Sequence, residues 1–253
     1  SDGEQRTDMI NYFNTLPGLG IRPTGTYIKS EILPYDDPKN HVKLQDLRLV
    51  RDYLKQEGRE DVKVKVSITG PITLGFACAC NGVEHYKGLA DVQLYYDFAR
   101  ALKPLAEEVA KTGCYLQIDE PCLSIRVMDA SQAVTIVNET MSRIPSSVRD
   151  EERLIVHVCG SLTSSLFQSL MDLETPVLSL AFSAPNVKAN LDVVSKPPLE
   201  SHGKKLGLGC VSVLARKREE VETFEQVSHR LEIVKAKLGK ECIAFVHPDC
   251  GLR

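Results

Sequence analysis

The fold class of this chain is indicated by the stretch Leu154-Ile155-Val156-His157-Val158-Cys159-Gly160. It is an apolar run that ends in an imidazole and a thiol, two groups that can bind a metal ion or take part in catalysis. A nearly continuous apolar run is typical of a strand that is covered on both faces in a parallel sheet. Side chains alternate along a strand, so His157 and Cys159 point the same way. We therefore predict a buried strand over residues 154–159 that presents an imidazole and a thiol at its carboxyl end.

Five more runs of the same kind occur along the chain, at 62–69, 114–119, 177–182, 206–213 and 242–247. Segments with helical spacing lie between or before the runs, at 8–16, 44–55, 91–112, 131–144, 162–173 and 218–238. Pro104 should kink the 91–112 helix or divide it in two. A candidate β-hairpin lies at 24–32. The alternation of strands and helices predicts βαβ units, and hence an α/β fold with a parallel sheet.

Two architectures contain such units: an open doubly wound sheet and a (β/α)₈ TIM-type barrel. Chemically active residues collect at the carboxyl ends of several runs, including Thr69, Asp119, His157 and Asp249. Convergence from many strands on one rim is typical of a barrel, whereas an open sheet gathers its ligands at one switch point. We therefore predict one barrel domain over residues 1–253. Because six strands are recognisable and the chain stops soon after the last, the first strands and the final helix are expected to be absent from this chain.

The composition is that of an ordinary globular protein. Of the 253 residues, 43% are hydrophobic and 26% are charged, and the net charge is −3. This balance argues against a nucleic-acid partner, and no run of about 18 apolar residues is present that would span a membrane. The polar amino terminus lacks the apolar core of a signal peptide, so we expect a cytoplasmic protein whose eight cysteines are reduced.

Cys250, which follows the last strand, can complete a metal site with His157 and Cys159. One imidazole and two thiolates form a ligand set that suits Zn²⁺ and leaves a fourth position for a further ligand or a substrate. Eight cysteines also make such a combination easy by chance. The spacing alone therefore leaves two readings open, a zinc site and a set of ordinary core cysteines.

Five segments carry a resemblance to a known family. They are the start at 2–13, Ile-Thr-Gly-Pro-Ile-Thr-Leu at 68–74, Gln-Ile-Asp-Glu-Pro-Cys-Leu at 117–123, His-Val-Cys at 157–159 and His-Pro-Asp-Cys-Gly-Leu-Arg at 247–253. In this order they resemble the catalytic domain of the cobalamin-independent methionine synthase family, and the resemblance spans the whole chain.

The resemblance implies a (β/α)₈ barrel enzyme, a methyltransferase in which zinc binds homocysteine as a thiolate that accepts a methyl group and becomes methionine. It assigns His157, Cys159 and Cys250 as zinc ligands. It also assigns Asp119 and Glu4 as the carboxylates that hold the ammonium of homocysteine, with Asp119 as a catalytic residue. Strand-end carboxylates are suitable partners for the ammonium of an amino acid.

Three departures from the family pattern bear on the metal and on the methyl donor. Ala181 stands where the family has a glutamate as its fourth zinc ligand, and His85, Cys78 and Cys80 are candidate substitutes. The chain has no tryptophan to stack on a pterin, and Leu214 stands where folate-using members have a proton-relaying histidine. A methyl-corrinoid donor needs neither of these residues. We therefore expect a methyl-corrinoid or a corrinoid protein as donor rather than methyltetrahydrofolate, as in short archaeal and anaerobe-type relatives.

Two other functions stay open at this point. A methyltransferase of the same superfamily could act on another thiol such as coenzyme M, since His157-Val158-Cys159-Gly160 also resembles that group's motif. Alternatively, the barrel could be degenerate and bind zinc without catalysis. Asp119 and Glu4 favour homocysteine, because a sulfonate acceptor such as coenzyme M has no ammonium to bind.

Overall fold

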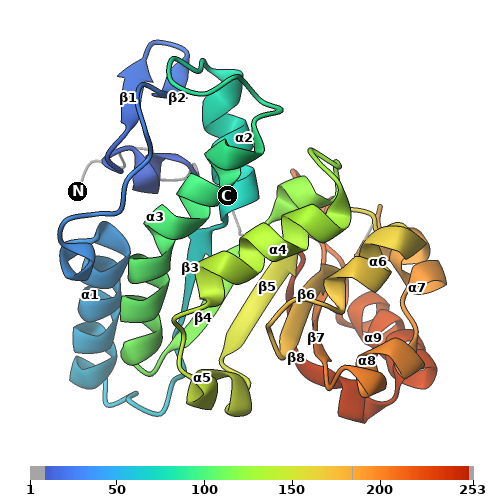
Figure 1. Cartoon of the computed structure of the whole chain (residues 1–253). Helices are drawn as coiled ribbons and strands as arrows, with labels where there is room; N and C mark the ends of the chain where they lie inside the picture. The colour runs from blue at the N-terminus through green and yellow to red at the C-terminus, as the bar shows by residue number, and fades with distance from the viewer. Residues whose placement is uncertain (1–8, 184, 251–253) are drawn as a thin grey trace.

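Six parallel strands form the central sheet, and their order in the sheet is their order in the chain (Figure 1). The computed structural model describes residues 9–183 and 185–250. The strands are β3 (Lys65–Thr69), β4 (Tyr115–Asp119), β5 (Leu154–Val158), β6 (Val177–Ala181), β7 (Lys205–Val211) and β8 (Ile243–Pro248). All six predicted strands are confirmed.

The strand order separates the two candidate architectures. A doubly wound sheet reverses its direction of growth at a switch point, so that successive strands lie on both sides of the first one. Here the strands from β3 to β8 follow one another without reversal, and each pairs in parallel with the next. This is the order of consecutive strands in a (β/α)₈ barrel, as predicted. Within the described ranges, no seventh strand joins this sheet.

Helices connect the strands and cover the outer side of the sheet (Figure 1). In the described residues they are α1 (Val42–Gln56), α2 (Pro71–Cys80), α3 (Val92–Lys111), α4 (Ala130–Met141), α5 (Ser146–Asp150), α6 (Ser164–Leu170), α7 (Val187–Val193), α8 (Lys196–Ser201) and α9 (Phe224–Leu238). The helices predicted at 44–55, 91–112, 131–144 and 162–173 are confirmed. None of the described helices combines the length and the hydropathy that crossing a bilayer requires.

Two expectations about local structure are wrong, and of the two outcomes expected at Pro104 one does not occur. α3 continues through Pro104, which therefore does not divide the helix. Of the segment 8–16, only a 3₁₀ turn at Asn11–Phe13 forms in its described part. The segment 218–238 is not one helix, because Thr223 and Gln226 form a reciprocal capping box that starts α9 at Phe224.

Sequence patterns did not predict α2, and they placed the β-hairpin too late in the chain. α2 is apolar all round and almost wholly buried, so it lacks the one-sided pattern from which helices are predicted. The hairpin pairs β1 (Leu19–Arg22) with β2 (Gly25–Ile28), earlier than the predicted 24–32, and Gly25 adopts a φ of 126° directly after the turn. Glycine tolerates this conformation, which explains the position of the turn.

The two faces of the sheet differ in chemistry. Alternate residues of β3 and β4 line one cavity: Lys65, Ser67, Thr69, Gln117 and Asp119. The residues between them are buried in the hydrophobic core: Val66, Ile68, Leu116 and Ile118. The period of two along each strand therefore gives the sheet an apolar side and a polar side. The polar side holds the candidate site.

Candidate metal centre

The structure brings His157, Cys159 and Cys250 together from the ends of two strands that are not neighbours in the sheet. His157 lies on β5, Cys159 directly follows it, and Cys250 follows β8. Their ligand atoms all lie within 4.8 Å of one another, and the two sulfur atoms are 3.1 Å apart. Within the described residues, this is the one group of three or more His, Cys, Asp or Glu side chains with such a spacing.

The donor set fits a zinc ion chemically. Two sulfurs at ideal zinc distances would lie about 3.7 Å apart in a tetrahedral site, so small side-chain movements would suffice. The hydrogen bond with Cys250 and partial burial raise the pKa of the Cys159 thiol. A bound cation reverses this preference, because it stabilises both thiolates.

A hydrogen-bonded chain fixes the orientation of His157. The Ser179 hydroxyl is fully buried and lies 2.9 Å from Nδ1 of His157 and 2.9 Å from Nε2 of His247. Nδ1 of His247 is 2.5 Å from the carbonyl oxygen of Pro248. Burial lowers the pKa of His247 to about 4, so this ring is neutral and has one N–H, which it donates to the carbonyl.

The carbonyl oxygen of Pro248 can only accept, so the N–H of a neutral His247 ring that bonds to it lies on Nδ1. Nε2 of His247 accepts from Ser179, so the Ser179 oxygen in turn accepts from Nδ1–H of His157. Nε2 of His157 is then the nitrogen left free to bind a metal ion. Such support of a ligand imidazole by a second group is common in metal sites.

Asp249 holds the loop that carries Cys250. Its carboxylate accepts from the backbone N–H of Phe182 at 3.0 Å and from the hydroxyl of Ser183 at 2.6 Å. A Cβ atom at Gly209 would lie 2.3 Å from the carboxylate, so glycine is required there for this close approach. The loop is therefore anchored to both β6 and β7.

No glutamate replaces the family's fourth ligand in the described part of the site. Ala181 is buried at the end of β6, and its carbonyl oxygen accepts from the side chain of Asn190 at 2.6 Å. The candidate substitutes His85, Cys78 and Cys80 do not join the cluster. The described residues thus offer three candidate ligands.

Asp119 lies beside the cluster and pairs in register with His157. Its carboxylate accepts from the amide of Gln117 at 2.6 Å, and the amide oxygen of Gln117 accepts from Lys65 at 2.7 Å. Burial raises the pKa of Asp119, and His157 and Gln117 oppose this effect. Glu4, the other predicted partner of the substrate ammonium, lies outside the described residues.

Glu120, next to Asp119 in the sequence, has a structural role. It is fully buried and accepts from the backbone N–H groups of Ile72 and Thr73, both at 2.9 Å, and from the Thr73 hydroxyl at 2.7 Å. These donors belong to the first turn of α2, whose N–H groups have no partner within the helix. Of the two adjacent acidic residues, Asp119 alone lines the cavity.

The cavity beside the cluster has a volume of ≈ 680 Å³. Besides the metal-binding group and Asp119, it is lined by two lysines, Lys43 and Lys65, which sequence reasoning missed. The alternation Lys-Val-Ser-Ile-Thr at 65–69 is a signal for Lys65, since it places this residue on the side of Thr69. Lys43 comes from α1, and no local pattern points to it.

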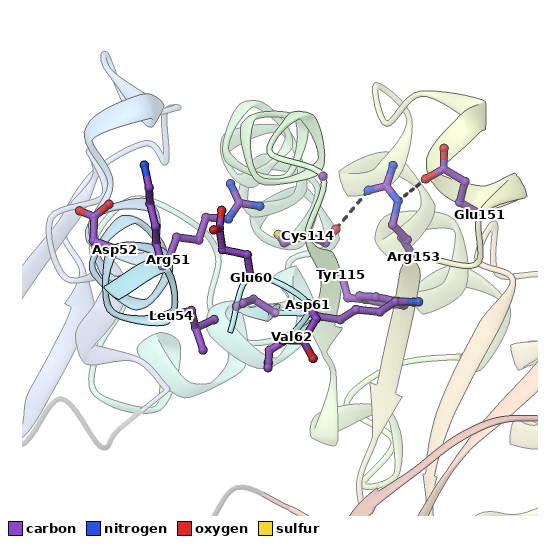
Figure 2. A pocket seen from close by; sticks show the side chains of 14 residues that line it. Arg51, Asp52, Leu54, Glu60, Asp61, Val62, Cys114, Tyr115, Glu151 and Arg153 are labelled. Atoms are coloured by element: carbon purple, nitrogen blue, oxygen red, sulfur yellow. Dashed lines mark hydrogen bonds and ion pairs between the residues drawn. The ribbon is translucent and has the colours of Figure 1, made fainter. Parts of the chain in front are cut away.

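A second cavity, of ≈ 700 Å³, lies at the amino ends of β3, β4 and β5 (Figure 2). Four basic and four acidic side chains line it. Arg153 donates to Glu151 at 2.5 Å and to the carbonyl oxygen of Cys114 at 3.2 Å, as the dashed lines in Figure 2 show. The basic and acidic side chains of this cavity are therefore equal in number. In barrels, residues at the amino ends of the strands typically serve stability.

Comparison with known proteins identifies relatives. A family model described as the catalytic domain of cobalamin-independent synthase matches residues 1–253. A methionine synthase of Methanocaldococcus jannaschii is 30% identical over 265 residues, which cover 100% of this chain and 76% of that protein. A methionine synthase of Saccharolobus islandicus is 29% identical over 191 residues, which cover 75% of this chain and 52% of that protein. The chain thus spans about half the length of the Saccharolobus relative.

A solved structure supports the fold. It is a B12-independent methionine synthase from a Shewanella species in complex with selenomethionine, and it superposes with a TM-score of 0.64 at 15% identity. The superposition covers 96% of this chain and 72% of the other. At this identity the likeness concerns the fold alone, and it confirms the predicted α/β barrel type.

Proposed function

Because the chain belongs to the family of cobalamin-independent synthase catalytic domains, we propose that it transfers a methyl group to the thiol of homocysteine and forms methionine. The observation that carries this proposal is the cluster of His157, Cys159 and Cys250 beside the carboxylate of Asp119. The names of the relatives, methionine synthase, agree with it.

In this proposal the residues of the site have three different roles. His157, Cys159 and Cys250 would hold a zinc ion, which when bound lowers the pKa of a thiol so that thiolate is present at neutral pH. Asp119 binds the substrate ammonium and so orients the sulfur. Ser179 keeps the correct nitrogen of His157 free.

The transfer itself is a displacement at the methyl carbon. The thiol of homocysteine first gives its proton to solvent. A lone pair of the sulfur then forms the new bond to carbon, while the bond between the methyl group and its donor breaks and its electron pair leaves with the donor. The protein positions the sulfur and the donor in line, and this positioning accelerates the reaction.

For the donor we propose a methyl-corrinoid or a methylated corrinoid protein. The chain has no tryptophan to stack on a pterin, and Leu214, at the position of the family's histidine, has no proton to deliver. The demethylated corrinoid leaves with the electron pair of the cobalt–carbon bond and needs no proton, whereas a folate leaving group needs one. Because the family is that of cobalamin-independent synthases, the corrinoid would be an incoming substrate rather than a resident cofactor.

Two alternatives can be separated from this proposal. Coenzyme M has no ammonium that could pair with the Asp119 carboxylate, which favours homocysteine. A degenerate barrel would bind zinc without catalysing methyl transfer, so zinc content and methyl transfer must be measured on the same protein.

The test replaces one ligand and one matched cysteine. Cys250→Ser should lose nearly all bound zinc and methyl transfer to homocysteine, because serine is a poor zinc ligand. Cys80→Ser, at an exposed position outside the cluster, should retain both. Zinc is measured by elemental analysis. Transfer is assayed with methylcobalamin, a methylated corrinoid protein and methyltetrahydrofolate.

Each outcome of this test decides one point. Unchanged zinc and activity in Cys250→Ser would refute the assigned centre. Activity with methyltetrahydrofolate alone would refute the corrinoid donor and leave the thiol acceptor in place. Zinc binding by the parent protein without transfer from any donor would favour the degenerate barrel.

A further inference from the structure

The two lysines of the candidate cavity differ in their partners. Lys65 donates to Gln117 at 2.7 Å, and Gln117 donates in turn to Asp119. The ammonium of Lys43 instead lies 3.7 Å from the centre of the Tyr12 ring. An aromatic face attracts a cation but does not fill its three N–H donors. In the described part of the chain, no carboxylate forms an ion pair with Lys43 and no oxygen accepts from its ammonium.

The position of Lys43 is unfavourable for stability. It lies in the first turn of α1, close to the helix end where the partial charge is positive and where acidic residues are preferred. Burial also lowers the pKa of Lys43, which means that its charged form is partly desolvated. Lys43 also lines the cavity that contains the candidate metal-binding side chains. An anionic ligand in this cavity would offset both disadvantages of its charge.

Asp119 supplies the other half of such a recognition pair. Burial lowers the pKa of Lys43, and of the two described carboxylates that oppose this effect, Asp119 acts more strongly than Asp46. Both Lys43 and Asp119 line the cavity. An α-amino acid carries an ammonium and a carboxylate on one carbon atom, so its recognition needs an anion and a cation close to each other.

We propose that Lys43 binds the carboxylate of the substrate and that Lys43 and Asp119 together select thiols that are α-amino acids. This inference rests on the proposed function and assigns a specificity-determining residue to the same cavity. It explains why the cavity holds a cation beside a carboxylate that is expected to bind an ammonium. It also predicts that a thiol with only one of the two charged groups binds poorly.

The experiment compares three thiols with three variants. Homocysteine carries both charged groups, aminopropanethiol lacks the carboxylate, and mercaptobutyrate lacks the ammonium. Each is titrated into zinc-loaded protein by calorimetry and into cobalt-substituted protein, where thiolate binding changes the visible spectrum. Lys43→Met removes the charge and Lys43→Arg keeps it. Lys55→Met makes the same change at an exposed position near the other end of α1.

The expected result is a selective loss. In Lys43→Met, homocysteine and mercaptobutyrate should bind about tenfold more weakly, whereas the affinity for aminopropanethiol should not change. The carboxylate of homocysteine should then no longer contribute to its affinity. Lys43→Arg should recover most of the affinity, and Lys55→Met should resemble the parent protein. Far-ultraviolet circular dichroism and the thermal midpoint establish that each variant is folded.

Two results would overturn the inference, and they are distinguishable. If Lys43→Met weakens all three thiols equally, or none of them, Lys43 does not bind the carboxylate, while the proposed function stands. If no thiol binds to the metal-loaded parent protein, the proposed function fails and this inference fails with it.

Discussion

The cavities at the two ends of the sheet have similar volumes, ≈ 700 Å³ at the amino ends and ≈ 680 Å³ at the polar side near the carboxyl ends, but they use charge differently. At the amino ends, Arg51 donates to the carbonyl oxygen of Thr112 and Arg153 pairs with Glu151. Near the carboxyl ends, two thiols face each other, and among the residues that the structure describes the ammonium of Lys43 contacts an aromatic ring and has no ion-pair partner. Donors that are satisfied within the protein serve stability, whereas donors left without protein partners are available to a ligand.

The largest effect on stability should arise beside the candidate site, at Glu120. Glu120→Ala leaves two backbone N–H groups at the start of α2 and the Thr73 hydroxyl without their acceptor, in a place that water does not reach. Such orphaned groups should lower the free energy of unfolding by about 4 kcal/mol. Urea unfolding measures this loss. A loss below 1 kcal/mol would mean that Glu120 does not anchor α2.

The same residue predicts a pH dependence. Burial raises the pKa of Glu120 from 4.5 to about 7. Between these values the unfolded chain releases the proton while the folded protein keeps it. The part of the Glu120 contribution that depends on protonation is therefore fully present below pH 4.5 and is lost as the pH rises through 7. The loss should be about 3 kcal/mol relative to Glu120→Gln, which does not titrate. Unfolding free energies of both proteins that run parallel from pH 4.5 to pH 7 would contradict it.

The contrast between predicted and missed features has a physical cause. The six strands and the clustering of His157, Cys159 and Cys250 were predictable because apolar runs and strand-end residues are local patterns, and order along the chain then places the strand ends on one rim. The sequence also showed that alanine, at position 181, replaces the family's glutamate. α2 was missed because a helix buried on all sides has no amphipathic period.

Other features depend on contacts between distant segments. Ser179 looks like an ordinary strand residue until its hydroxyl is found between two histidines from β5 and β8. Lys43 looks like a solvated helix residue until the fold places it in the cavity. The anchoring of α2 by Glu120 also becomes visible only when the fold places this carboxylate beside Ile72 and Thr73. Such roles arise in the tertiary structure and leave no trace in spacing.

Ser179 gives a smaller effect that bears directly on the carboxyl-end site. Ser179→Ala removes the acceptor of Nδ1–H of His157, so this ring can change its tautomer or rotate, and zinc affinity should fall about tenfold. Ser179→Thr retains the hydroxyl and should restore most of the affinity. Competition with a chromogenic chelator measures both, and ¹⁵N chemical shifts of His157 report its tautomer. Equal zinc affinity and an unchanged tautomer in Ser179→Ala would show that this hydrogen-bonded chain does not orient the imidazole.

The smallest effect should come from the amino-end cavity. The Glu151 side chain is 58% exposed, and its partner Arg153 also donates to a backbone carbonyl, so Arg153 does not depend on Glu151 alone. Glu151→Ala should therefore change the free energy of unfolding by less than about 0.5 kcal/mol and leave zinc affinity unchanged. Urea unfolding at low and high salt measures the first, and chelator competition the second. A loss well above 1 kcal/mol, or any change in zinc affinity, would mean that the charges of this cavity are coupled to the candidate site, and the division of roles between the two ends of the sheet would no longer hold.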